Sequence, residues 1–203
     1  MVTRLRRSEQ TERNRERVLA AARRVFLARG YHAASLDQIA EEAGFSKGVV
    51  YSQFRNKADL FLELLEARIA ERAEENARLA EELDGPGAVR RLIEHLVRVG
   101  REQAGWGLLV IEFRVHAARD EQLNARYAAA HARALDALAD AIGRAFASAG
   151  AEPPFPPRRT AGIVLATGTG VQLEQPADPS AFSGEGGAEL LTHLITRTER
   201  STL

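Results

Sequence analysis

The stretch GFSKGVVYSQFRNKADLF, residues 44–61, contains both lysines of the chain, Lys47 and Lys57, and every other basic residue is an arginine. It also contains Ser46 and Asn56, two residue types that favour the position just before a helix, because their side chains accept a backbone N–H there. The stretch therefore predicts two successive helix starts, each followed directly by a lysine. What this lysine-bearing segment binds is the first question that the sequence poses.

The residues before this stretch predict two further helices. A first helix is expected over residues 11–29, since its apolar residues follow helical spacing and Gly30 supplies a stop. A second begins after Ser35, which with Gln38 forms a capping box. It ends at Gly44, and a tight turn leads into the helix expected over residues 47–54. Two short helices joined by such a turn predict a helix-turn-helix.

The expected helix over residues 47–54 turns its apolar residues inward and leaves hydroxyl, amide and cationic groups exposed. Such a helix can contact phosphates and base edges in a DNA major groove. The charge distribution agrees, because residues 1–57 carry 12 basic and 6 acidic residues, whereas residues 58–203 carry 16 and 22. A basic end on an acidic body is typical of polyanion binding. A structural helical hairpin that binds nothing is the alternative.

The stretch SLDQIAEEAGFSKGVVYSQFRNKADLF, residues 35–61, closely resembles the DNA-binding segment of the TetR family of bacterial transcriptional regulators. The positions in register are Ile39, Ala40, Ala43, Gly44, Ser46, Gly48, Tyr51, Phe54, Lys57 and Leu60. Val49 and Gln53 depart from the frequent family residues, which leaves the operator sequence open.

The resemblance implies that Lys57 anchors a phosphate and that Lys47 makes a second backbone contact. Gln53 is the candidate for base readout, since its amide can pair with adenine. The predicted DNA-binding residues are Ser35, Ser46, Lys47, Gly48, Val49, Tyr51, Ser52, Gln53 and Lys57.

The resemblance also implies an all-α fold of about nine helices, with a DNA-binding domain over residues 1–55 and an effector-binding and dimerisation domain over residues 56–203. Arg4, Arg6 and Arg7 form a basic N-terminal arm, for which a disordered tail is the expected state. A long fourth helix, to about residue 83, joins the two domains. Helical periodicity predicts the remaining helices over residues 87–103, 105–119, 121–149, 158–174 and 186–198.

One face of the helix over residues 105–119 is the candidate effector site. Trp106, Leu109, Phe113 and His116 share a helical stripe, and Glu112 lies one turn before His116. Aromatic walls with a few polar groups are typical of small-molecule sites, so we expect an apolar or aromatic effector. The alternative is that the stripe is ordinary core.

The last two helices are the candidate interface of a two-fold dimer, which lets a helix-turn-helix protein span two half-sites. Small residues recur every four positions, which would let backbones approach closely, and leucines and an isoleucine supply apolar area. The predicted interface residues are Gly162, Ala166, Gly170, Leu173, Leu191, Leu194 and Ile195. The alternative is that they pack within one subunit.

Other function classes find little support. The chain has no cysteine and no catalytic or metal-binding motif, so we expect no cofactor and no metal, and an all-helical enzyme is a distant alternative. No uncharged stretch is long enough to span a bilayer, which predicts a soluble cytoplasmic protein without membrane contacts. The sequence thus predicts a homodimeric transcription factor that binds a duplex DNA operator, a repressor released by a small effector. An activator, or control by a partner protein, stays open.

Overall fold

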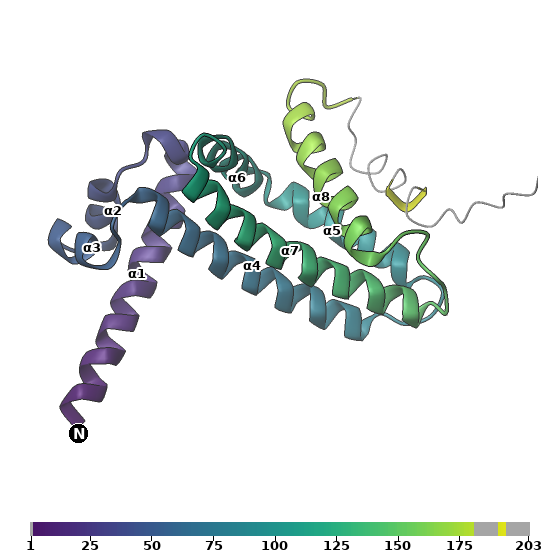
Figure 1. Cartoon of the computed structure of the whole chain (residues 1–203), viewed down its shortest axis with the longest axis horizontal. Helices are drawn as coiled ribbons and strands as arrows, with labels where there is room; N and C mark the ends of the chain where they lie inside the picture. The colour runs from purple at the N-terminus through teal and green to yellow at the C-terminus, as the bar shows by residue number, and fades with distance from the viewer. Residues whose placement is uncertain (1, 181–190, 194–203) are drawn as a thin grey trace, which may run out of the picture. The chain divides into compact units, whose positions relative to one another are not determined.

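The structure of the protein is a computed structural model that describes residues 2–180 and 191–193, with side chains from residue 9 onward. These residues are helical without any strand (Figure 1). The helices are α1 Val2–Ala33, α2 Leu36–Ala43, α3 Lys47–Gln53, α4 Lys57–Glu82, α5 Ala88–Glu102, α6 Ala104–Ala117, α7 Glu121–Ser148 and α8 Pro157–Glu174. Residues 191–193 are also helical, within the ninth helix expected over residues 186–198. The predicted all-α fold of about nine helices is confirmed.

The chain forms two compact units. The head unit comprises Met1–Arg68 and Leu109–Tyr127, and the body unit comprises Ile69–Leu108 and Ala128–Leu203. Since α4, α6 and α7 each contribute residues to both units, the compact units differ from the predicted DNA-binding domain over residues 1–55 and effector-binding domain over residues 56–203. The predicted domains were defined by function, and they stay a prediction. No helix in the described part of the chain is both long and apolar enough to cross a membrane.

The first helix differs from its prediction at both ends. It begins at Val2, so the backbone of the expected N-terminal arm is helical, while the side chains of Arg4, Arg6 and Arg7 lie outside the described residues. The helix breaks at Gly30, with φ 75° and ψ 168°, and then continues for a short turn to Ala33. Only glycine adopts this backbone region readily, because a side chain there is strained.

Aromatic rings fill the core of the head unit. Tyr31 follows the break in α1, and its ring centroid lies 5.3 Å from that of Phe61 on α4 and 5.0 Å from that of Phe113 on α6. The rings of Phe61 and Phe113 are themselves 4.4 Å apart. Burial raises the pKa of Tyr31 to about 12. The head therefore has a core of its own, to which part of α6 contributes.

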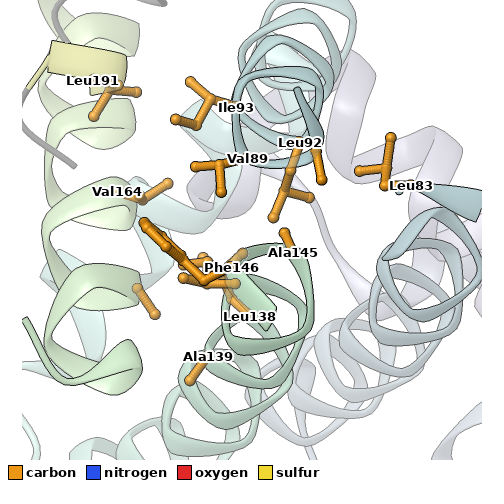
Figure 2. Close-up of a cluster of buried hydrophobic side chains, with 13 residues drawn as sticks. Leu83, Val89, Leu92, Ile93, Leu138, Ala139, Ala145, Phe146, Val164 and Leu191 are labelled. Atoms are coloured by element: carbon orange, nitrogen blue, oxygen red, sulfur yellow. The ribbon is translucent and has the colours of Figure 1, made fainter. Parts of the chain in front are cut away.

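The core of the body unit is aliphatic and lies between α5, α7, α8 and the end of α4 (Figure 2). Its buried members are Leu83, Ala88, Val89, Leu92, Ile93, Leu138, Ala139, Ile142, Ala145, Phe146, Ala161, Val164 and Leu191. The turn before α5 contains Gly85 at φ 68°, where the sequence predicted a helix end. This aliphatic core packs α5 against α8.

Candidate nucleic-acid interface

The turn between α2 and α3 is built by backbone hydrogen bonds. The side chain of Ser35 accepts the N–H of Gln38 at 3.3 Å, and the Gln38 amide oxygen accepts the N–H of Ser35 at 3.0 Å, so the predicted capping box is confirmed. At the other end of α2, Gly44 takes a left-handed conformation with φ 71°. Its N–H and that of Phe45 donate to carbonyls in the last turn of α2, as a helix C-cap requires.

Two arginines of α1 hold this turn and the following helix in place. Arg17 donates to the carbonyl of Ala43 at 3.1 Å, and its guanidinium lies 4.5 Å from the centre of the Phe45 ring. Arg15 bonds both carboxylate oxygens of Glu63 on α4 and lies 4.7 Å from the centre of the Phe54 ring. Because Arg17 and Arg15 contact Phe45 and Phe54, which flank α3 on its two sides in the chain, α1 supports both ends of this short helix.

The surface of α3 divides into a buried and an exposed side. Val50 and Phe54 are buried at 0% and 2% exposure. The exposed residues are Ser46, Lys47, Gly48, Tyr51 and Ser52, and Val49 and Gln53 are half-buried. The Ser46 side chain makes no capping hydrogen bond, contrary to expectation, so its hydroxyl is not committed to the helix end. The exposed side thus presents hydroxyls and a cation on a rigid support.

A carboxylate missed in the sequence lies on this exposed side. Asp37, in the first turn of α2, accepts a hydrogen bond from Lys47 through one oxygen and from the Tyr51 hydroxyl through the other, the latter at 3.3 Å. The hydrogen bond from Lys47 lowers the pKa of Asp37, and the same bond raises the pKa of Lys47. No local signal reveals the contact, because ten residues separate the two charges.

The amide of Gln53 is only partly available at the surface. Its side-chain oxygen is buried and has no hydrogen-bond partner. An unsatisfied buried acceptor is costly, so a donor that reaches this oxygen would be favoured. The predicted base readout by Gln53 therefore requires its amide to turn outward, and it stays a prediction.

Lys57 makes contacts that the sequence did not predict. Its ammonium donates to the carbonyls of Tyr31, His32 and Ala34 at 2.7, 3.0 and 2.9 Å, and lies 4.7 Å from the centre of the Tyr31 ring. Burial lowers the pKa of Lys57, while the three carbonyls favour its charged form. All three donors of the ammonium are thus engaged within the head, and a phosphate contact would require at least one of them to be released.

Glu112 and His116, predicted to orient an effector, lie against the end of α1. The Glu112 carboxylate accepts the N–H of Tyr31 at 2.7 Å, and the His116 ring lies 5.6 Å from that of His32. In the same stripe Leu109 and Phe113 are buried at 2% and 0% exposure in the head unit, whereas Trp106 belongs to the body unit. This arrangement favours ordinary core for the part of the stripe after residue 108.

Among its described residues, the body unit has two buried side-chain polar atoms without hydrogen-bond partners, the oxygen of Asn76 on α4 and the Nε2 of His95 on α5. Asn76 is only 3% exposed. Burial and the guanidinium groups of Arg98 and Arg72 lower the pKa of His95, whose Nδ1 lies 3.0 Å from Arg98. The ring is therefore favoured in its neutral form. Because the Arg98 guanidinium can only donate, Nδ1 accepts its hydrogen bond and Nε2 carries the proton, so Nε2 is a donor.

An apolar cavity of about 10 Å³ lies in the body core, lined by Leu92, Leu96, Phe146 and neighbouring residues. It has room for about one water-sized probe. Its apolar walls do not favour water, and a larger guest would have to push the surrounding helices apart.

The predicted dimer residues fall into four groups. Ala166 and Leu173 are exposed, Leu173 at 50%, and a side chain at Gly170 would meet nothing within 4 Å. Gly162 is half-buried and faces Leu135. Leu191, by contrast, is 5% exposed within the core of its own subunit, which favours the alternative for this residue. Leu194 and Ile195 lie outside the described residues.

Part of the head unit is similar to known bacterial regulators. Residues 18–64 match the family model of the "Bacterial regulatory proteins, tetR family". The HTH-type transcriptional activator FasR of Mycolicibacterium smegmatis is 45% identical over 58 residues, which are 29% of this chain and 26% of that protein. The matched part of the chain spans less than two thirds of the length of the first curated relatives.

Solved structures resemble almost the whole chain. Salmonella enterica GusR has a TM-score of 0.65 at 28% identity and covers 91% of this chain and 96% of its own. A regulator FadR from Bacillus subtilis, in complex with stearoyl-CoA, has a TM-score of 0.70 at 16% identity, with 91% and 99% covered. At the latter identity the likeness concerns the fold alone.

The contacts of Lys57 predict a structural role that can be measured. We expect Lys57→Met to lower the free energy of unfolding by about 1–3 kcal/mol, because three backbone carbonyls lose their donor. Urea unfolding followed by circular dichroism measures this change. Lys47→Met is the matched control, since the Lys47 side chain is 68% exposed and a surface ion pair contributes little. Equal unfolding midpoints for the two variants would contradict the capping role.

Proposed function

We propose that the chain is a dimeric transcriptional regulator of the TetR family that binds a duplex operator through α3, because its residues 18–64 match the model of that family. The carrying observation is the exposed side of α3, where Lys47 and Tyr51 stand on a helix whose other side is locked into the head core. A regulator needs such a support, because base contacts discriminate only when the reading helix is held at a fixed angle.

Within this function we propose two kinds of contact to DNA. Phosphates are contacted by cations and hydroxyls, foremost Lys47, Tyr51 and Ser46, which are exposed. Base edges are read by the amide of Gln53 and the methyl groups of Val49. Both residues are half-buried and belong to the same short helix as Lys47 and Tyr51. Ser35, Gly48 and Ser52 complete the surface. Lys57 contacts a phosphate only if it gives up a carbonyl.

The experiment that tests this proposal isolates the operator from genomic fragments and compares two variants on it. Gln53→Ala should change the preferred base at one position of each half-site, where a good amide–base pair is worth about 1–3 kcal/mol. Tyr51→Phe is the matched control, because it removes one hydroxyl and should weaken all duplexes alike. Affinities are measured by fluorescence anisotropy across a set of single-base operator variants. A Gln53→Ala protein with unaltered preference would contradict the assignment.

The salt dependence of the same measurement separates the two lysines. Loss of one phosphate contact makes the slope of log K against log salt shallower by about one. Lys47→Met should show this change and Lys57→Met should not. A protein without salt-dependent affinity for any duplex would contradict DNA binding itself.

We further propose that α8 contributes the dimer interface. The exposed Ala166 and Leu173 and the half-buried Gly170 share one side of the helix at spacings of three and four. No partner chain is needed to bury Leu191, which packs in the core of its own subunit. The interface therefore rests on the exposed side of α8.

The paired substitution Ala166→Glu with Leu173→Glu tests this interface. We expect a folded monomer by light scattering, because two charges on an exposed surface disturb only a partner subunit. Leu191→Glu is the control, and it should unfold the body, since it places a charge in the apolar core. A paired variant that stays a dimer would contradict the interface on α8.

We propose that a small apolar or aromatic effector binds the body and releases the operator. The unsatisfied oxygen of Asn76 and the Nε2 of His95 support a site in the body unit, because a bound effector could supply their missing partners. The engaged Glu112 and the buried Phe113 speak against the stripe first expected over residues 105–119. To release DNA, the effector must bind better to a state unsuited to the operator, because equal affinity for both states shifts nothing.

This proposal is tested by measuring whether compounds release the protein from its operator. The compounds are a panel of small aromatic molecules and stearoyl-CoA, which is included because one structural neighbour binds it. Trp106 is the only tryptophan, so its fluorescence can follow binding. Asn76→Leu should weaken an active compound at least tenfold, about 1.4 kcal/mol, because the compound loses a buried acceptor. Phe113→Leu should leave its affinity unchanged. The reverse result would return the effector to the 105–119 stripe.

Activation of transcription is a second candidate outcome of operator binding. The relative FasR, 45% identical over 58 residues, is a transcriptional activator. In vitro transcription from a promoter that carries the operator distinguishes the two modes, since a repressor lowers transcript and an activator raises it.

A further inference from the structure

Asp37 places a negative charge where the proposed DNA surface needs positive charge. Its two carboxylate oxygens accept hydrogen bonds from Lys47 and from the Tyr51 hydroxyl. The side chain is 43% exposed, so the carboxylate lies at the surface and not in the core. Two of the three groups foremost proposed to contact phosphates are therefore already hydrogen-bonded to an anion of the protein itself.

A carboxylate and a phosphate offer the same chemistry to these donors, because both present anionic oxygens that only accept hydrogen bonds. The N–H of Lys47 and the O–H of Tyr51 that donate to Asp37 cannot at the same time donate fully to a DNA phosphate. A duplex that approaches α3 must displace Asp37 from them or leave them unused. The approaching phosphates also meet the like charge of the carboxylate, which lowers affinity.

We propose that Asp37 is a specificity-determining residue that competes with DNA phosphates for Lys47 and Tyr51. This inference rests on the proposed function. On non-specific DNA, phosphate contacts supply essentially all the affinity, so the competition weakens that binding directly. On the operator, base contacts hold α3 against the DNA backbone, so Lys47 exchanges Asp37 for a phosphate and the competition costs less affinity there. Asp37 therefore widens the gap between operator and non-specific DNA.

The test measures the affinity of Asp37→Asn for the operator and for a scrambled duplex over a range of salt. We expect about a two- to fivefold gain on the scrambled duplex, the scale of an exposed ion pair, and a smaller gain on the operator. The salt slope on the scrambled duplex should steepen by up to about one, since Lys47 becomes available to a phosphate. No gain, or an equal gain on both duplexes, would overturn the inference.

Two controls separate this competition from a general effect of charge. Glu42→Gln removes the same charge from α2 and breaks an exposed ion pair to Arg24, but it frees no group of α3, so the ratio of the two affinities should stay unchanged. In a Lys47→Met background, Asp37→Asn should lose most of its effect on the scrambled duplex, and an undiminished effect would contradict competition for Lys47. If the unmodified protein binds neither duplex, the proposed function fails; if it binds and Asp37→Asn changes nothing, only the inference fails.

Discussion

The end of α1 is the point on which the head depends. The helix breaks at Gly30 and ends soon after, at Ala33, and side chains from other helices bond the backbone groups of this end. Lys57 donates to three of the carbonyls, and Glu112 accepts the N–H of Tyr31. Two charged side chains of opposite sign thus satisfy backbone groups of opposite polarity. Because α2 begins only a few residues later, the placement of α2 and α3 depends on how these peptide groups are held.

Much of this fold could be predicted from the sequence, because its signals are local. The capping box of Ser35 and Gln38 and the left-handed Gly44 fix both ends of α2 within eight residues of chain, and both are present as expected. The Asn56 side chain accepts the N–H of Asp59 at 2.8 Å, as its position before α4 suggested. Helix ends in the body lie within one or two residues of those predicted, since turn residues separate them.

The candidate site could be predicted only in outline, because its decisive contacts join residues far apart in the chain. Lys57 is separated by more than 20 residues from the carbonyls it caps, and Glu112 by 81 from Tyr31. No periodicity records such contacts. The exposed side of α3 follows from helical spacing, whereas the contact of Asp37 with Lys47 requires the angle between α2 and α3. Leu191 illustrates the same limit, since apolar character alone does not say whether a leucine packs in its own subunit or in a dimer.

The composition of the head unit has a consequence for building chimaeric regulators. Exchange of modules at a linker assumes that each module is one continuous segment. Here the head comprises residues 1–68 together with 109–127. A graft of residues 1–55 alone would place the Gly30 region against the recipient's counterparts of Lys57 and Glu112. The fit at this place is tight, because in the present chain a Cβ added at Gly30 would lie 2.9 Å from the Glu112 carboxylate. Heads of this kind are interchangeable only when the segment equivalent to 109–127 travels with them.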